Sequence, residues 1–104
     1  MIDIETLKEY YNNNKILMTE HASNRSRQRG ITQKDIKSCI MSGEIIEQYE
    51  GDFPFPSCLI FGHSEDNRII HVVASDNGEY SKIITAYIPD TETFESDLKT
   101  RKEK

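Results

Sequence analysis

A histidine and two arginines fall at helical spacing in the segment HASNRSRQRG, residues 21–30. His21, Arg25 and Arg29 stand at i, i+4 and i+8, so on a helix they form one stripe. A guanidinium group is a rigid fork of N–H donors that matches a phosphate, and an imidazole exchanges protons near neutral pH. The stripe could therefore bind a phosphate. Arg27 points away from it, as a surface charge that can assist substrate binding.

The same stripe has a structural alternative. It flanks Ala22 on the side of the helix that faces the body of the protein, so we expect its groups to be partly shielded from water. A shielded guanidinium group without an anionic partner costs several kcal/mol. Internal ion pairs with Glu44, Glu47 or Asp52 would supply that partner without any ligand. Spacing alone leaves both interpretations open.

The charge of the chain limits what it can bind. The formal net charge is −5 at pH 7, whereas proteins with general affinity for a nucleic-acid backbone are usually basic. The positive charge is local, because five Lys or Arg and a single acid, Asp35, lie between His21 and Lys37. The sequence thus disfavours a general nucleic-acid surface and leaves one strongly positive segment.

Length and composition predict one soluble domain over residues 1–104, with a charged tail from about residue 99. No apolar run approaches the ~20 residues that span a bilayer, and the N-terminus lacks the features of a signal peptide. Cys39 and Cys58 match no zinc or redox spacing, so we expect reduced thiols in a cytoplasmic protein. We expect no metal, no cofactor and no membrane association.

Local signals predict an α+β fold. The expected helices are residues 2–11, a second from Thr19 to Gly30, and a third from Thr32 to Gly43. The KILMT segment between the first two is expected to be short and extended. Four β-rich runs follow, EIIEQY, CLIFG, RIIHVVAS and YSKIITAYI, which predict a roughly four-stranded antiparallel meander covered by the helices. Phe94 and Leu98 suggest a short closing helix.

The last hairpin decides which side chains share a face of the sheet. Asn-Gly at residues 77–78 predicts a two-residue turn. That turn pairs His71 with Ile84, which places His71 beside Lys82 and puts Tyr87 on the opposite face; a slip of one residue would reverse this. The strand is apolar on both faces, so His71 is either a buried histidine with satisfied hydrogen bonds or a functional group.

The loop FPFPS, residues 53–57, suggests a protein partner, since exposed aromatic side chains often mark an interface. The alternative is that Phe53 and Phe55 fill the core.

Several motifs taken together resemble a known family. They are the His21, Arg25 and Arg29-Gly30 spacing, GEIIEQY from Gly43 to Tyr49, Pro56 and Cys58 before an apolar run, His71, and TAY-P from Thr85 to Pro89. Over roughly residues 5–103 the chain resembles small bacterial domains of unknown function, similar to BrnT-type and MqsR-type toxins of the RelE-like superfamily. Ser23 and Ser26 depart from the apolar residues usual there, so we expect the second helix to dock less firmly.

The resemblance implies a RelE/BrnT-like fold and a type II toxin that cleaves RNA without a metal, by attack of the ribose 2′-hydroxyl on the adjacent phosphate. It also implies a zinc-finger antitoxin of the YgiT/MqsA type as partner. The candidate catalytic residues are then His21, Arg25, Arg29, His71 and Tyr87, and the candidate substrate-binding residues are Arg27, Lys82 and Tyr49. The alternatives are a non-catalytic protein- or RNA-binding domain of the same fold and a domain whose basic stripe is purely structural.

Overall fold

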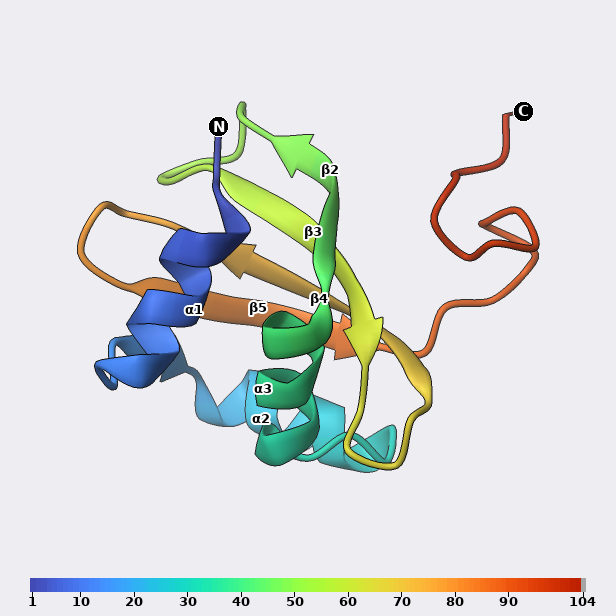
Figure 1. Cartoon of the computed structure of the whole chain (residues 1–104), viewed down its shortest axis with the longest axis horizontal. Coiled ribbons are helices and arrows are strands. Elements are labelled where there is room, and N and C mark those ends of the chain that lie inside the picture. Colours follow the sequence, from blue (N-terminus) through green and yellow to red (C-terminus); the bar gives the residue numbers. More distant parts are fainter. Residues whose placement is uncertain (104) are drawn as a thin grey trace.

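Three helices precede most of the sheet in the computed structural model, which describes residues 1–103 (Figure 1). The helices are α1 (Ile4–Asn12), α2 (Glu20–Gln28) and α3 (Gln33–Ser42). The strands are β1 (Ile16–Met18), β2 (Glu44–Tyr49), β3 (Ser57–His63), β4 (Ile69–Ser75) and β5 (Ser81–Tyr87). The α+β class predicted from the sequence is confirmed.

The strands form one mixed sheet in the order β1-β5-β4-β3-β2. Strands β2 to β5 make the predicted antiparallel meander. The expectation of four antiparallel strands is nevertheless wrong, because the KILMT segment supplies β1, which pairs parallel to β5 at the edge of the sheet. A parallel pair needs a long crossover connection, and here the chain between β1 and β5 supplies it.

The predicted helix ends are confirmed by their capping contacts. The Thr19 hydroxyl accepts from the Ala22 N–H at the start of α2. Thr32 and Asp35 cap α3 reciprocally, each side chain accepting from the other residue's backbone N–H. Helix α2 stops at Gly30, whose φ of +74° is the left-handed conformation that glycine adopts most easily.

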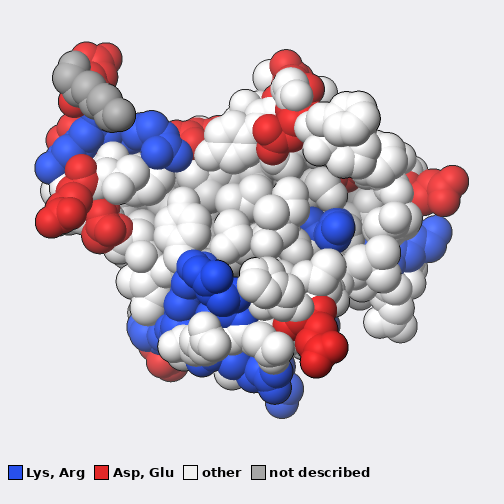
Figure 2. Space-filling model, turned by 180° about the vertical axis from the view of Figure 1, so that it is seen from behind, with Lys and Arg blue, Asp and Glu red and all other residues white. Residues whose placement is uncertain are grey.

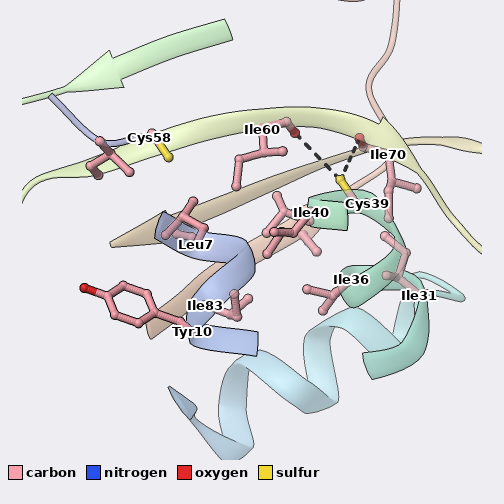
Figure 3. Close-up of a cluster of buried hydrophobic side chains, with 14 residues drawn as sticks. Leu7, Tyr10, Ile31, Ile36, Cys39, Ile40, Cys58, Ile60, Ile70 and Ile83 are labelled. Atoms are coloured by element: carbon pink, nitrogen blue, oxygen red, sulfur yellow. Dashed lines mark hydrogen bonds between the residues drawn. The ribbon is translucent and has the colours of Figure 1, made fainter. Parts of the chain in front are cut away.

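Helices α1 and α3 cover one face of the sheet and bury the core there (Figures 1 and 3). Leu7 of α1 and Ile40 of α3 meet Ile60 and Ile83 of the sheet, all at most 1% exposed. The Cys39 thiol lies 3.7 Å from the Ile70 carbonyl oxygen, as Figure 3 shows. Burial raises the pKa of the Cys39 and Cys58 thiols to about 12, so both are inert thiols.

The segment after β5 crosses part of the opposite face of the sheet. Phe94 is 2% exposed there and forms an isolated antiparallel bridge with Arg101. The predicted closing helix is wrong, since residues 91–103 contain turns and no helix. The Asp90 and Asp97 carboxylates accept hydrogen bonds from the backbone N–H groups that follow them, which stabilises turns in competition with a helix.

The register of β4 with β5 differs from the predicted one. Asn77 does initiate a turn, but its side chain accepts from the N–H groups of Glu79 and Tyr80, so the loop is longer than two residues. A bulge then shifts the pairing farther along the strands. His71 pairs with Tyr87 instead of Ile84. The two side chains therefore share the face opposite the helices. The register expected from a two-residue turn is wrong, and the question that the sequence left open is decided by the observed pairing.

Candidate active site

His71 and Tyr87 form a hydrogen-bonded pair beneath the segment that follows β5. The Nε2 atom of His71 lies 2.7 Å from the Leu98 carbonyl oxygen, and Nδ1 lies 3.2 Å from the Tyr87 hydroxyl. A carbonyl oxygen can only accept, so Nε2 carries the proton, and in the neutral ring Nδ1 accepts from Tyr87. The backbone at Leu98 has a φ of +58°, the left-handed conformation that presents this carbonyl.

The surroundings of His71 keep its ring neutral. The residue is fully buried, and its ring meets those of Phe61, Tyr87 and Phe94 edge-on, with the Phe94 centroid 4.7 Å away. Burial lowers the pKa of His71, and the hydrogen bond to Leu98 opposes this only in part. His71 is thus a buried histidine with both nitrogens satisfied. It also remains a neutral proton acceptor behind a half-buried tyrosine.

Tyr87 connects this buried pair to the surface. It lines a hollow of about 340 Å³ together with Arg29 from α2 and Arg101 from the C-terminal segment. Arg29 donates from Nη1 to the Ala86 carbonyl oxygen at 2.8 Å and to the Thr85 hydroxyl at 3.2 Å. Both partners are uncharged. Among residues 1–103, no carboxylate lies within ion-pair distance of Arg29.

Arg101 differs from Arg29 because its charge is already paired. It donates to both carboxylate oxygens of Glu47, at 3.0 and 3.1 Å, and lies 4.9 Å over the Phe94 ring. Tyr49 donates its hydroxyl to the same carboxylate. Arg101 and Tyr49 hold the pKa of Glu47 below its usual value. The unpaired cation in the hollow is therefore Arg29, and an incoming anion meets it first.

The internal ion-pair alternative for the α2 stripe is wrong. Its three groups are exposed rather than shielded. The candidate acids are engaged elsewhere: Glu44 with Lys99, Glu47 with Arg101, and Asp52 with Ser57. Figure 2 shows basic side chains gathered over α2 and near the C-terminal segment, with uncharged surface between them.

The structure brings only some of the predicted site residues together. Arg29, Tyr87 and, behind it, His71 meet at the hollow. His21 lies two helical turns from Arg29, about 12 Å along α2, and Arg25 lies between them. Arg27 bonds to Asn24, Tyr49 bonds to Glu47, and Lys82 lines a separate hollow.

Three residues of this site were not predicted from the sequence. Arg101 lies in the charged tail KTRKEK, which carries no motif. Phe94 and Leu98 were noticed only as apolar positions of a helix that does not form. The spacing of Phe94 and Leu98 within a charged terminal segment is the one feature of the sequence that indicates packing of this segment on the sheet.

Helix α2 docks through little apolar surface, as expected from its serines. Its buried residues are Ala22 and Ser26. The Ser26 side chain is 2% exposed, and its hydroxyl has no hydrogen-bond partner among residues 1–103. A hollow of about 180 Å³ lies beside it. The helix that leads to Arg29 therefore buries only small side chains, one of them with an unsatisfied hydroxyl.

The FPFPS loop is exposed, so the interpretation of its aromatic residues as core plugs is wrong. Phe53 is 94% exposed and Phe55 43% exposed. Both line a hollow of about 320 Å³ on the open face of the sheet.

Comparison with known proteins places the chain in a family. The family described as "Domain of unknown function (DUF4258)" matches residues 18–88, more than half of the chain. The chain belongs to the DUF4258 family. The matched part of this DUF4258 domain contains Arg29, His71 and Tyr87, but neither α1 nor Arg101. No curated protein and no solved structure matches the chain significantly.

Residues 1–103 of the DUF4258 protein lack two features that would point to other kinds of site. No helix there is both long and apolar enough to cross a membrane. No group of three or more His, Cys, Asp or Glu side chains in this range is placed to hold a metal ion.

Proposed function

We propose that the protein is a metal-independent endoribonuclease with a RelE/BrnT-like fold, acting as the toxin of a type II toxin–antitoxin system. The observation that carries the proposal is the hollow that Arg29, unpaired with any carboxylate of residues 1–103, and Tyr87 line together. Tyr87 is in turn hydrogen-bonded to His71. A cation for phosphate and a hydroxyl backed by a neutral imidazole are the groups that 2′-hydroxyl attack needs.

The positions of the protons on His71 and Tyr87 allow this pair to act as the base for the ribose 2′-hydroxyl. Because the hydrogen of Tyr87 points to Nδ1 of His71, the lone pairs of the Tyr87 oxygen are free to accept. The oxygen takes the proton of the 2′-hydroxyl while its own proton passes to Nδ1. The O2′–P bond then forms, the P–O5′ bond breaks, and O5′ takes a proton from water. The hydroxide that this leaves takes back the proton held by His71 and Tyr87, which restores the neutral pair. The products are a cyclic phosphate and a free 5′-hydroxyl.

Arg29 supplies the positive charge of the hollow that no ion pair within residues 1–103 neutralises, and Asp90 adds a carboxylate to the same lining. Arg29 would stabilise the charge that grows on the phosphoryl oxygens, because its partners on β5 are neutral and leave its full charge available. Arg25, one turn away on the exposed stripe, would guide the strand toward Arg29. Glu47 lies near His71 and would favour its transient imidazolium form, and Arg101, which is paired with Glu47, opposes this effect.

Substituting Arg29 by alanine tests the proposal. With single-stranded RNA and a chelator, we expect the protein to produce fragments ending in a cyclic phosphate. Arg29→Ala should slow cleavage by about 100-fold or more, the usual effect of removing one donor to a developing anion. Its thermal midpoint should change little, since it loses two hydrogen bonds and no ion pair.

The matched control is Arg27→Ala, which removes an equal charge from the same helix, away from the hollow. It should retain most of the cleavage activity. Equal losses in the two variants would show that only the overall charge of α2 matters, and would contradict the role of Arg29.

We further propose a zinc-finger antitoxin of the YgiT/MqsA type as the partner. Ile84 and Ile88, 44% and 49% exposed, flank the site on β5 and just beyond it, and Phe53 lies across the same face. A partner that covered them would bury apolar surface and block the hollow. Co-expression with the neighbouring gene should give a complex that co-purifies and does not cleave RNA. Separate purification of the two proteins would contradict the pairing.

A further inference from the structure

A second hollow lies on the open face of the sheet, at the other end of β5 from Tyr87. Its volume is about 320 Å³, and its lining includes the side chains of Asp52, Phe53, Phe55, Tyr80, Lys82 and Ile84. The five-residue step from Tyr87 to Lys82 spans roughly 16 Å along a strand. Thr85, which accepts from Arg29, and Val73, its partner on β4, lie between the two hollows.

We propose that this second hollow binds an unpaired base of single-stranded RNA, a few nucleotides from the phosphate held at Arg29. The inference rests on the proposed ribonuclease function. Phe53 and Phe55 have no part in the core, and exposed aromatic rings on an open sheet face are stacking platforms for bases. A strand running along β5 would join the two hollows.

Lys82 supplies the charge that such a strand needs. Its side chain is exposed, and no carboxylate of residues 1–103 lies within ion-pair distance of it. A base stacked on the aromatic rings therefore has an ammonium group nearby for its phosphate.

Asp52 gives the hollow a preference among bases. One of its carboxylate oxygens, Oδ2, accepts from the Ser57 hydroxyl, and the other has no hydrogen-bond donor among residues 1–103. A free carboxylate oxygen accepts from an exocyclic amino group, which cytosine, adenine and guanine carry and uracil lacks. It would repel the carbonyl oxygens of uracil. The bound base is therefore one that carries an amino group.

Binding of labelled single-stranded RNA tests the stacking role. The Tyr87→Phe background is used so that little RNA is cleaved during the binding measurement. The double substitution Phe53→Ala and Phe55→Ala should weaken binding about tenfold or more, as expected for the loss of a stacked base. Leu17→Ala, which removes an exposed apolar side chain outside both hollows, should leave binding unchanged.

An RNA that lacks one base identifies the bound group. An abasic nucleotide is moved along the strand, one position at a time. At one position it should weaken binding to the protein that keeps Phe53 and Phe55 by the same factor as the double substitution does. The double variant should lose no further affinity with that RNA.

Lys82→Ala should reduce the slope of log K against log salt by about 0.7, the contribution of one phosphate on a single strand. Asp52→Asn should abolish the preference for cytosine over uracil at that position.

Unchanged RNA binding by the double variant would overturn the proposal. If that variant also lost the antitoxin complex, the hollow would be a protein docking surface instead. Weakened binding by the double variant, in a protein that cleaves no RNA in any form, would support the base site and reject the ribonuclease function. The two proposals can therefore fail separately.

Discussion

Replacing Tyr87 by phenylalanine is expected to slow RNA cleavage by about 100-fold or more while leaving the protein folded. The substitution removes one hydroxyl and keeps the ring that packs against His71 at 5.3 Å between centroids. Without the hydroxyl, the 2′-hydroxyl of the RNA loses its path to Nδ1 of His71, and acid–base catalysis by one group typically contributes 10²- to 10⁴-fold. The measurement is single-turnover cleavage of a labelled RNA.

The pH dependence of the same reaction shows whether His71 accepts a proton during cleavage or only packs in the protein. Burial lowers the pKa of His71, so its accepting, neutral form is present at pH 7. Cleavage should fall as the pH drops through that lowered pKa, which lies below the ordinary imidazole value of about 6.5. In Tyr87→Phe this fall should disappear from the residual rate. A midpoint above pH 7 would contradict His71 as the acceptor.

Tyr11→Phe is the matched control. Tyr11 packs against the core on the helical side of the sheet, and its hydroxyl has no hydrogen-bond partner among residues 1–103. The substitution removes the same atom from a place outside the hollow and should leave cleavage unchanged. Wild-type cleavage by Tyr87→Phe would reject the proposed base.

Replacing Gly62 by alanine is expected to lower the free energy of unfolding more than the substitutions proposed at the hollow do. A Cβ atom at this position would lie 2.2 Å from the Cys39 carbonyl oxygen and 2.9 Å from two further backbone atoms of Cys39. These atoms belong to α3, so a side-chain rotation cannot relieve the clash, and the helix must move off β3. Overpacking costs about 1–3 kcal/mol where side chains can adjust, and we expect at least the upper end here.

Urea unfolding of Gly62→Ala measures this loss as a lower midpoint. Gly51→Ala provides the control, since no atom lies within 4 Å of its added Cβ, and its free energy of unfolding should change by less than about 0.5 kcal/mol. A Cβ atom added at Gly43 would lie 2.3 Å from the same Cys39 carbonyl oxygen, so Gly43→Ala should resemble Gly62→Ala. A stable Gly62→Ala would show that α3 lies farther from the sheet than described.

The sequence by itself determined the elements whose signals are local. Thr19, Thr32 and Gly30 mark helix ends because capping hydrogen bonds and a left-handed glycine act within a few residues. The four β-rich runs formed the predicted meander because short links join consecutive strands, which pairs neighbours antiparallel, and such a sheet needs to cover only one face completely. The stripe on α2 followed from helical periodicity alone. Arg29, His71 and Tyr87 were candidates within a larger catalytic set that also held His21 and Arg25, and whether His71 and Tyr87 share a face was left open.

Only the tertiary structure decided that these three residues meet. Their grouping depends on the β4–β5 register, which the Asn77 side chain and one bulge shift away from the pairing that a two-residue turn would impose. It also depends on the C-terminal segment, which brings Leu98 to His71 and Arg101 to Glu47 across long sequence separations. Such contacts form because the open face of the sheet must bury Phe94 and satisfy His71, and no local pattern in the sequence records that requirement.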